Sequence, residues 1–398
     1  MTSLEFPLTR EGPYAPPKAY AEIREGDPIT RVNLPEGGQA WVVSRHEDAR
    51  QVLNDRRFSS DRTNPDFPLM IKGARQFRRS DRPRAMISMD APEHGEARRA
   101  VLGEFTVRRM EALRPRIHEI VDQQIDALLA GPNPGDLVET VSLAVPSLVI
   151  CEMLGVPYDD HEFFQERTAK MLRRATSAED RRAAADEVDA YIAELITRKE
   201  AAPPDDLLGR QIVKLREEGT YDHAALVTTG FLLLLAGHET TANMISLGTL
   251  ALLENPDQLA AIKADPGKIP EAVEELLRYF TIVDLATARV CVEDASIGGV
   301  TIKAGEGVLV LGYAANRDPR AFENPDALDI ERGARHHVAF GFGPHQCLGQ
   351  NLARMELQIV FGTLFRRAPG LRLAAPVGEL PFKDDAAIYG LYRLPVTW

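Results

Sequence analysis

The sequence predicts a mainly α-helical protein with small β-sheets, folded as a single domain over residues 1–398. Apolar residues recur at helical spacing over long segments, whereas strand patterns are few and short. With 44% hydrophobic and 27% charged residues, the composition is that of an ordinary globular protein. No internal repeat, low-complexity tract or long linker divides the chain, so one domain is the simplest organisation.

The expected helices follow one another along most of the chain. Helical patterns cover residues 95–130, 137–154, 160–200, 205–217, 222–254, 269–279 and 349–367. The segment 222–254 is long enough to form one rod that crosses the whole molecule. Pro270 lies near the start of the following helix, where its missing N–H costs little.

Strand patterns are confined to short segments, which predict small sheets beside the helical body. They cover residues 40–43, 289–292, 308–311 and 392–396. The segment 312–335 is rich in Gly, Pro, Asn and Asp and is long for a structureless loop. We therefore expect an irregular but ordered meander there.

Charge, hydropathy and cysteine usage argue against several classes of protein. A net charge of −12 does not suit a nucleic-acid binder, which needs a basic patch to neutralise phosphates. Residues 1–20 contain no apolar core of signal-peptide length, and no segment reaches the ~20 apolar residues that cross a bilayer. Three cysteines are too few for a disulfide framework and fit a reducing compartment. We expect a cytoplasmic protein without a membrane or nucleic-acid partner.

Cys347 lies in the segment Phe340-Gly-Phe-Gly-Pro-His-Gln-Cys-Leu-Gly349, which ends where a helix is expected to begin. The helix dipole and free amides at such a place stabilise a thiolate and tune a metal bound to it. The glycines let the backbone approach a flat ligand closely. The residues alone leave two other roles open for Cys347: a nucleophilic thiol assisted by His345, or an inert buried side chain.

A second motif, Ala236-Gly-His-Glu-Thr-Thr241, lies within the long helix 222–254. Small Ala236 and Gly237 leave room on a helix face, and the Thr240 hydroxyl can bond to the carbonyl four residues back. Glu239 beside Thr240 offers a carboxylate and a hydroxyl for a proton relay. Taken alone, the motif also has an ordinary structural explanation, because threonine pairs are common in helices.

The cysteine segment resembles the haem-binding signature of the cytochrome P450 family, Phe-x-x-Gly-x-His/Arg-x-Cys-x-Gly, at every fixed position. Residues 236–241 resemble the oxygen-binding motif of the same family, and the similarity runs from residue 40 or so to Trp398. The resemblance implies the cytochrome P450 fold, with haem b between the long helix and the cysteine loop. It also implies a soluble bacterial monooxygenase of actinobacterial type, with Cys347 as the axial ligand of the haem iron.

The resemblance assigns roles to further residues. The implied haem-binding positions are Cys347, Phe340, Gly349, His345, Ala236, Gly237, His94, Arg98 and Arg289. Glu239 and Thr240 would be catalytic. His94 and Arg98 lie four residues apart on an expected helix, which suits two haem propionates or, without the resemblance, an exposed basic face.

Glu275 and Arg278 are three residues apart on an expected helix, a spacing usually worth only a weak surface pair. The family's matching Glu-x-x-Arg pair is joined by a cation from the meander, here Arg332. The resemblance therefore implies that these three residues support the haem loop.

The resemblance also places a substrate pocket and implies a reaction. The pocket positions are Leu232, Ala236, Val283, Leu285, Ala286 and Ile388. The loop 61–88, with Phe67 and Phe77, would contact substrate, and helices within 160–200 would form a lid. The implied reaction is hydroxylation of a hydrophobic small molecule of polyketide, macrolide or xenobiotic type with one atom of O2.

No flavin or nicotinamide fingerprint follows the haem loop, so we expect electrons from an iron–sulfur ferredoxin and its NAD(P)H-dependent reductase. Arginines such as Arg108 and Arg109 would guide this acidic partner. The remaining histidines, His238 among them, lack zinc-site spacing and are expected mostly at the surface of a monomer. Two alternatives are a non-catalytic haem sensor and a cysteine hydrolase that uses Cys347 and His345 without haem.

Overall fold

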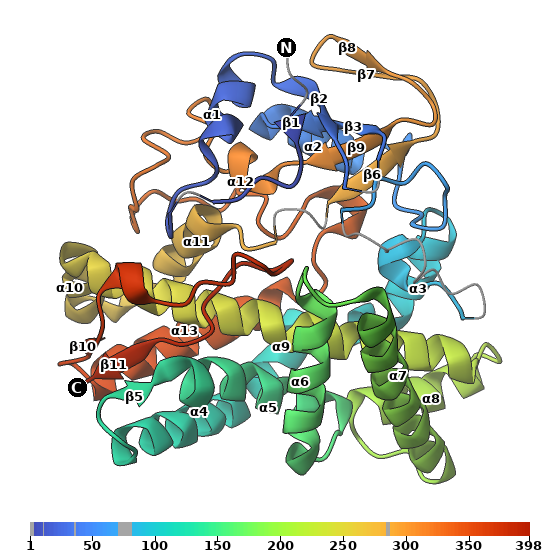
Figure 1. Ribbon diagram of the computed structural model, residues 1–398. Helices are drawn as coiled ribbons and strands as arrows, with labels where there is room; N and C mark the ends of the chain where they lie inside the picture. Colours follow the sequence, from blue (N-terminus) through green and yellow to red (C-terminus); the bar gives the residue numbers. More distant parts are fainter. Residues whose placement is uncertain (1–3, 11, 36, 71–81, 284–286) are drawn as a thin grey trace. The chain divides into compact units, whose positions relative to one another are not determined.

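The computed structural model describes residues 4–10, 12–35, 37–70, 82–283 and 287–398. Its elements group into two compact units, which are treated separately below (Figure 1). The first unit comprises residues 1–78, 87–95 and 270–348, and the second comprises residues 79–86, 96–269 and 349–398. The expectation of a single domain stays a prediction.

A six-stranded mixed sheet with the order β1-β2-β3-β9-β6-β4 is the centre of the first unit (Figure 1). Its strands are β1 (Leu4–Glu5), β2 (Ile29–Asn33), β3 (Gln39–Val43), β4 (Phe58–Ser59), β6 (Ala288–Cys291) and β9 (Gly307–Val310). β3 pairs in parallel with β9, and β6 pairs antiparallel to β9. The strands β3, β6 and β9 were predicted within one residue, whereas β1, β2 and β4 were not predicted.

The helices and a hairpin of the first unit surround this sheet. They are α1 (Lys18–Glu25), α2 (His46–Asn54), nearly all of α11 (Ile269–Phe280), α12 (Gly312–Ala315), β7 (Ala295–Ile297) and β8 (Val300–Ile302). The β7–β8 turn uses Gly298 and Gly299, both with positive φ, as a two-residue hairpin turn requires. The meander after α12 is irregular but ordered, as predicted.

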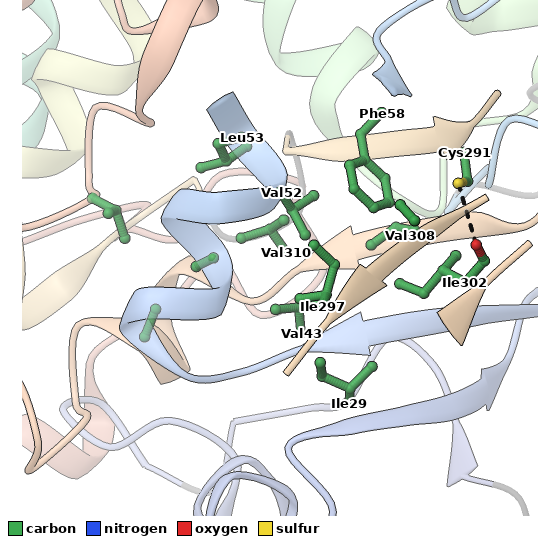
Figure 2. Close-up of a cluster of buried hydrophobic side chains, with 14 residues drawn as sticks. Ile29, Val43, Val52, Leu53, Phe58, Cys291, Ile297, Ile302, Val308 and Val310 are labelled. Carbon is green, nitrogen blue, oxygen red and sulfur yellow. Dashed lines mark hydrogen bonds between the residues drawn. The ribbon is translucent and has the colours of Figure 1, made fainter. Parts of the chain in front are cut away.

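A hydrophobic cluster joins α2 to the sheet and the hairpin in the first unit (Figure 2). Val52 and Leu53 of α2 lie with Val308 and Val310 of β9 in this cluster, and Ile297 of the hairpin is fully buried among them. Burying one such side chain stabilises the folded state by about 1.5–3 kcal/mol. The cluster thus fixes α2, on which the cysteine loop of this unit packs.

The second unit is built almost entirely from helices. They are α4 (Val107–Ala130), α5 (Ala144–Leu154), α6 (His161–Leu172), α7 (Ala178–Ala201), α8 (Leu207–Glu217), α9 (His223–Glu254), α10 (Pro256–Ala264) and α13 (Gln350–Arg367). A small sheet of the order β10-β11-β5 completes it, from β5 (Gly135–Asp136), β10 (Arg372–Leu373) and β11 (Pro395–Thr397). The strand expected at 392–396 is therefore shorter and begins later.

Helix α9 is the core of the second unit and packs against α5, α7 and α13. Asp222 caps it, because its side chain accepts a hydrogen bond from the Ala225 amide. Every residue from Thr241 to Leu252 is buried, so tertiary packing holds this half of the helix on all sides. None of the helices in the described ranges is both long and apolar enough to cross a membrane.

Two long segments with helical patterns are each divided into two helices, at breaks that the sequence analysis did not locate. The segment 95–130 breaks into α3 (Glu93–Leu102) and α4, because the Thr106 side chain accepts from the Arg109 amide and starts a new helix. The segment 160–200 breaks into α6 and α7, and Ser177 caps α7 by accepting from the Asp180 amide. Amphipathic spacing continued through both breaks, so periodicity did not show them.

Candidate functional site

The cysteine loop of the first unit is held by its own backbone. The Cys347 amide donates a 2.8 Å hydrogen bond to the Phe340 carbonyl, and a short 3-10 turn spans Gly343–His345. Gly343 has a φ of +71°, and a Cβ there would lie 2.7 Å from the Leu53 carbonyl oxygen. Glycine is therefore required where the loop meets α2. Helix α13 begins three residues after Cys347, as the sequence predicted.

The three cysteines differ in exposure. Cys347 is exposed, whereas Cys151 and Cys291 are buried. Burial raises the pKa of Cys151 to about 12 and also raises the pKa of Cys291, so both thiols stay protonated. Cys347 is thus the cysteine that can present sulfur to a ligand, and the interpretation of Cys347 as an inert buried side chain was wrong.

Cationic and imidazole groups gather in the first unit at positions assigned to propionates. The rings of His94 and His345 lie with their centroids 3.9 Å apart, and His94 is buried. Helix α3 carries His94 and Arg98 at the predicted four-residue spacing. The two imidazole rings therefore lie together in the structure, and their binding of a haem propionate stays a prediction.

Arg289 on β6 is a buried cation that forms no ion pair among the described residues, although Asp90 is near enough to act on its charge. It is 6% exposed, and its guanidinium donates a 2.8 Å hydrogen bond to the carbonyl of Ala288. Burial and the nearby Arg62 together lower the pKa of Arg289 to about 10, while Asp90 acts in the opposite direction. Because a buried cation is costly unless it is paired, this site favours an anionic ligand.

One face of α9 in the second unit is exposed near the middle of the helix, beside residues that are buried. Ala236 is exposed, and Leu232 and Thr240 are partly exposed. The Thr240 hydroxyl donates a 2.8 Å hydrogen bond to the Ala236 carbonyl, as predicted. Gly237 has a packing reason that was not predicted, because a Cβ there would lie 2.9 Å from the Ile150 side chain of α5.

Glu239 is buried in the second unit and has two polar partners. The Lys383 ammonium lies 3.2 Å from its Oε2 atom, and the Asn243 amide donates to the same oxygen at 3.2 Å. Lys383 belongs to the C-terminal segment and is itself 9% exposed. Sequence analysis did not find Lys383 or Asn243, since neither lies in a recognisable motif and Lys383 is distant in the chain.

His238 joins α9 to α6 within the second unit. Its Nδ1 lies 2.9 Å from the Leu234 carbonyl, so Nδ1 carries the proton, and its Nε2 lies 2.9 Å from the Thr168 hydroxyl. Burial lowers the pKa of His238 and keeps the ring neutral. The expectation of surface histidines was wrong for His46, His238 and His337, which are all buried.

The Glu275, Arg278 and Arg332 arrangement is confirmed in the first unit. Arg278 donates to both carboxylate oxygens of Glu275 at 2.7 Å, and Arg332 adds a 3.2 Å contact to Oε1. Both Glu275 and Arg278 are fully buried. This network ties α11 to the meander.

The expected pocket residues are only partly placed. Leu232 is half-buried and Ile388 is buried in the second unit, and Val283 is half-buried in the first. Leu285, Ala286 and Phe77 lie outside the described residues. Phe67 is buried in a core cluster of the first unit with Tyr20 and Val42, so its expected substrate contact is replaced by a packing role.

Comparisons with known proteins agree on one family. The sequence profile described as Cytochrome P450 matches residues 269–368. The chain is 51% identical over 393 residues to pentalenic acid synthase of Streptomyces avermitilis, covering 99% of this chain and 97% of that protein. It is 48% identical over 394 residues to vitamin D3 dihydroxylase of Streptomyces griseolus, covering 99% and 96%.

Among solved structures, cytochrome P450 MoxA from Nonomuraea recticatena is similar with a TM-score of 0.92 and 62% identity, covering 99% of this chain and 98% of that one. A helical fold with a cysteine loop and a threonine-bearing long helix defines an oxygen-activating haem protein. The chain belongs to the cytochrome P450 family. It is a monooxygenase with haem as its cofactor, so the sensor and hydrolase alternatives fall away.

The residues present fit haem. The exposed Cys347 thiol can ligate iron, and buried Arg289 supplies a cation for a propionate. Exposed Ala236 and partly exposed Thr240 leave one face of α9 open next to the buried Glu239. Each unit therefore shows a feature that a protein without a bound ligand would not need.

Proposed function

We propose that this monooxygenase hydroxylates a hydrophobic small molecule of polyketide, macrolide or xenobiotic type, and that Cys347 would ligate the haem iron. Glu239 and Thr240 form its proton relay, and a ferredoxin with its reductase supplies electrons. The open α9 face carries this proposal, because the Thr240 hydroxyl lies on it with its hydrogen engaged. Substrate, O2, two electrons and two protons give hydroxylated product and water.

Cys347 is the residue whose thiolate would determine the reactivity of the cofactor. Haem with a thiolate ligand supplies the oxidising chemistry, since cysteine ligation favours O–O cleavage. The Cys347 amide is already bonded to the Phe340 carbonyl, so the loop is held in place by its own chain. Arg289, His94 and His345 would bind the propionates and Arg98 would assist from α3.

The Thr240 hydroxyl would position an O–H group on the open face by accepting a hydrogen bond from it. A threonine hydroxyl has one donor hydrogen and two acceptor lone pairs. Because the hydrogen is given to the Ala236 carbonyl, the lone pairs are left to accept from an O–H group on the open face. Glu239, the preceding residue, holds the carboxyl group that replenishes the proton.

Replacing Thr240 by alanine tests this relay. We expect binding of substrate to persist while product per NADH falls several-fold and peroxide rises, because proton delivery is disordered. Thr229→Ala is the matched control, since Thr229 donates the same type of 2.9 Å bond to Ala225 in the same helix. An equal ratio of product to NADH in both variants would show that Thr240 has only a structural role.

The axial-ligand assignment has a spectroscopic test. Cys347→His should abolish the red-shifted absorbance band of the reduced CO complex, because that band depends on thiolate ligation. Cys291→Ala should keep the band, since Cys291 is buried in the core of Figure 2. Retention of the band in Cys347→His would refute the assignment.

Electron delivery is supported by an exposed basic and apolar patch in the second unit. Arg99, Arg108 and Arg109 are exposed there, beside the exposed side chains of Leu102 and Val107, which are 45% and 65% accessible. Basic rims steer acidic partners, and an apolar centre adds contact. Arg108→Glu with Arg109→Glu should slow reduction by a ferredoxin without changing the CO band.

The substrate class rests on the relatives. Two of them are named for pentalenic acid and vitamin D3, and the crystallised hydroxylase from Micromonospora griseorubida is bound to mycinamicin VIII. These names belong to those proteins, and they support a hydrophobic substrate here. Spectral titration with macrolides, other polyketides and drug-like molecules, followed by turnover, would test it; polar metabolites as the only ligands would contradict it.

A further inference from the structure

A buried polar cluster in the second unit surrounds Glu239 with residues from three elements. Lys383 of the C-terminal segment and Asn243 of α9 both bond to Glu239. Thr168 of α6 bonds to His238, which precedes Glu239 in the chain. Buried polar groups are retained only where their hydrogen bonds are satisfied. The cluster is therefore a defined arrangement around the carboxylate that the proposed relay uses.

The loop that carries Lys383 is fixed against α9. The Lys383 amide donates a 2.9 Å hydrogen bond to the Gly390 carbonyl, which closes the segment 383–390 into a loop. A Cβ on Gly390 would lie 1.8 Å from Oδ1 of Asn243, so only glycine allows this close approach. The loop backbone thus packs directly on the asparagine that also bonds Glu239.

The same loop is paired with the end of α6. The Arg174 amide donates to the Asp385 carbonyl at 2.7 Å, and the Ala387 amide donates to the Leu172 carbonyl at 2.9 Å. Displacement of the end of α6 would therefore displace the loop and, with it, Lys383. Helix α6 lies in the segment expected to form the lid.

Glu239 is anchored on one oxygen only. Lys383 and the Asn243 side chain both bond to Oε2, and no hydrogen bond to Oε1 occurs among the described residues. His238 is neutral because burial lowers its pKa, so Lys383 is the charge that compensates the carboxylate in this cluster. Removing the ammonium would leave a buried carboxylate without its counter-ion.

We propose that Lys383 is a positioning residue for proton delivery: it anchors Oε2 of Glu239 and leaves Oε1 as the proton-carrying atom. The loop 383–390 thereby links the end of α6 to the orientation of this carboxylate. The inference rests on the proposed role of Glu239 as a relay. Protons enter from solvent and leave with the product water, so no additional reactant is needed.

The test compares Lys383→Met, Lys383→Arg, Glu239→Gln and the double variant Glu239→Gln/Lys383→Met in the holoenzyme. Asp385→Asn is the matched control, because it alters the loop at the Tyr392 hydrogen bond and leaves the Lys383–Glu239 pair intact. Product, NADH and peroxide are measured together, with the substrate dissociation constant from spectral titration. Hydrogen–deuterium exchange of residues 381–391 without substrate gives a readout that does not depend on turnover.

We expect Lys383→Met to lower product turnover roughly tenfold, less than the 10²–10⁴ typical of a lost proton-transfer group, because Glu239 is displaced rather than removed. Substrate binding should change little, and exchange in 381–391 should rise. Lys383→Arg should restore both properties, since arginine keeps the charge. The double variant should match Glu239→Gln, because the two residues act in one step.

The outcomes separate this inference from the proposed function. Loss of coupling in Glu239→Gln with a parent-like Lys383→Met would overturn the inference and keep the relay. Parent-like coupling in Glu239→Gln would overturn the relay itself. If Lys383→Met does not accumulate as folded protein, Lys383→Arg and the double variant decide: a double variant with clearly lower turnover than Glu239→Gln contradicts the proposal.

Discussion

Two buried glutamates, Glu275 in the first unit and Glu239 in the second, differ in how their carboxylates are bonded. Glu275 accepts hydrogen bonds on both oxygens, from Arg278, Arg332 and the Asp329 amide. Glu239 accepts on Oε2 alone, from Lys383 and Asn243. A carboxylate with both oxygens bonded is suited to supporting structure, whereas one with an unbonded oxygen is suited to exchanging a proton.

The difference also concerns charge. Glu275 faces two guanidinium groups, which bind carboxylates in a rigid forked geometry. Glu239 faces one ammonium, a point charge on a flexible stem. The first arrangement resists reorientation and the second allows it, so the two sites should respond differently to substitution.

The largest expected effect is on the Glu275 network. Glu275→Gln leaves buried Arg278 and Arg332 without a counter-charge and should lower the free energy of unfolding by about 3–5 kcal/mol. Urea unfolding and the yield of folded protein measure it. Glu194→Gln, which breaks an exposed pair with Arg198, should cost less than about 0.5 kcal/mol; similar losses in both would contradict a scaffold role.

Arg289 extends the comparison to a buried cation that forms no ion pair among the described residues. Arg289→Gln should leave the haem-free protein at least as stable, because the buried charge is removed. It should weaken haem retention by about 1.5–3 kcal/mol, the worth of a hydrogen bond to a charged group. Haem transfer to apomyoglobin measures this, with Arg198→Gln as an exposed control. Unchanged haem retention in Arg289→Gln would show that Arg289 does not bind a propionate.

A pH effect should arise from His238 in the Glu239 cluster. Its pKa is lowered from 6.5 by burial and by Lys383, while Glu239 acts in the opposite direction. The unfolded chain therefore takes up the proton first, so the stability present above pH 6.5 is lost as pH falls toward the folded pKa. The slope is at most about 1.4 kcal/mol per pH unit for one proton. His238→Gln should flatten this part of the unfolding curve, and parallel curves would disprove it.

The smallest expected effect is at Thr168. Thr168→Val removes the hydroxyl that bonds His238 and should cost about 0.5–1.5 kcal/mol of unfolding free energy, the usual worth of one hydrogen bond. Thr197→Val is the control, since its hydroxyl bonds only to the Ala193 carbonyl within α7. An equal loss in both variants would show that the link between α6 and α9 is not stabilising.

Several parts of the fold followed from local sequence. The long helix α9 and the strands β3, β6 and β9 were predicted within one residue, because their apolar spacing is strong. Thr106 and Ser177 were missed as caps, since a hydroxyl residue inside a periodic pattern looks the same whether or not it starts a helix. The burial of His238 was not predicted, because it depends on α6, which is distant in the sequence.

The sequence by itself determined the cysteine loop, the Thr240–Ala236 hydrogen bond and the Glu275–Arg278 spacing, because each depends on residues that are neighbours in the chain or on one helix. Tertiary structure alone decided which carboxylate became saturated and which kept a free oxygen. Lys383 lies 144 residues from Glu239, and Arg332 lies 57 residues from Glu275. Such partners are selected by packing and burial, which no local pattern encodes.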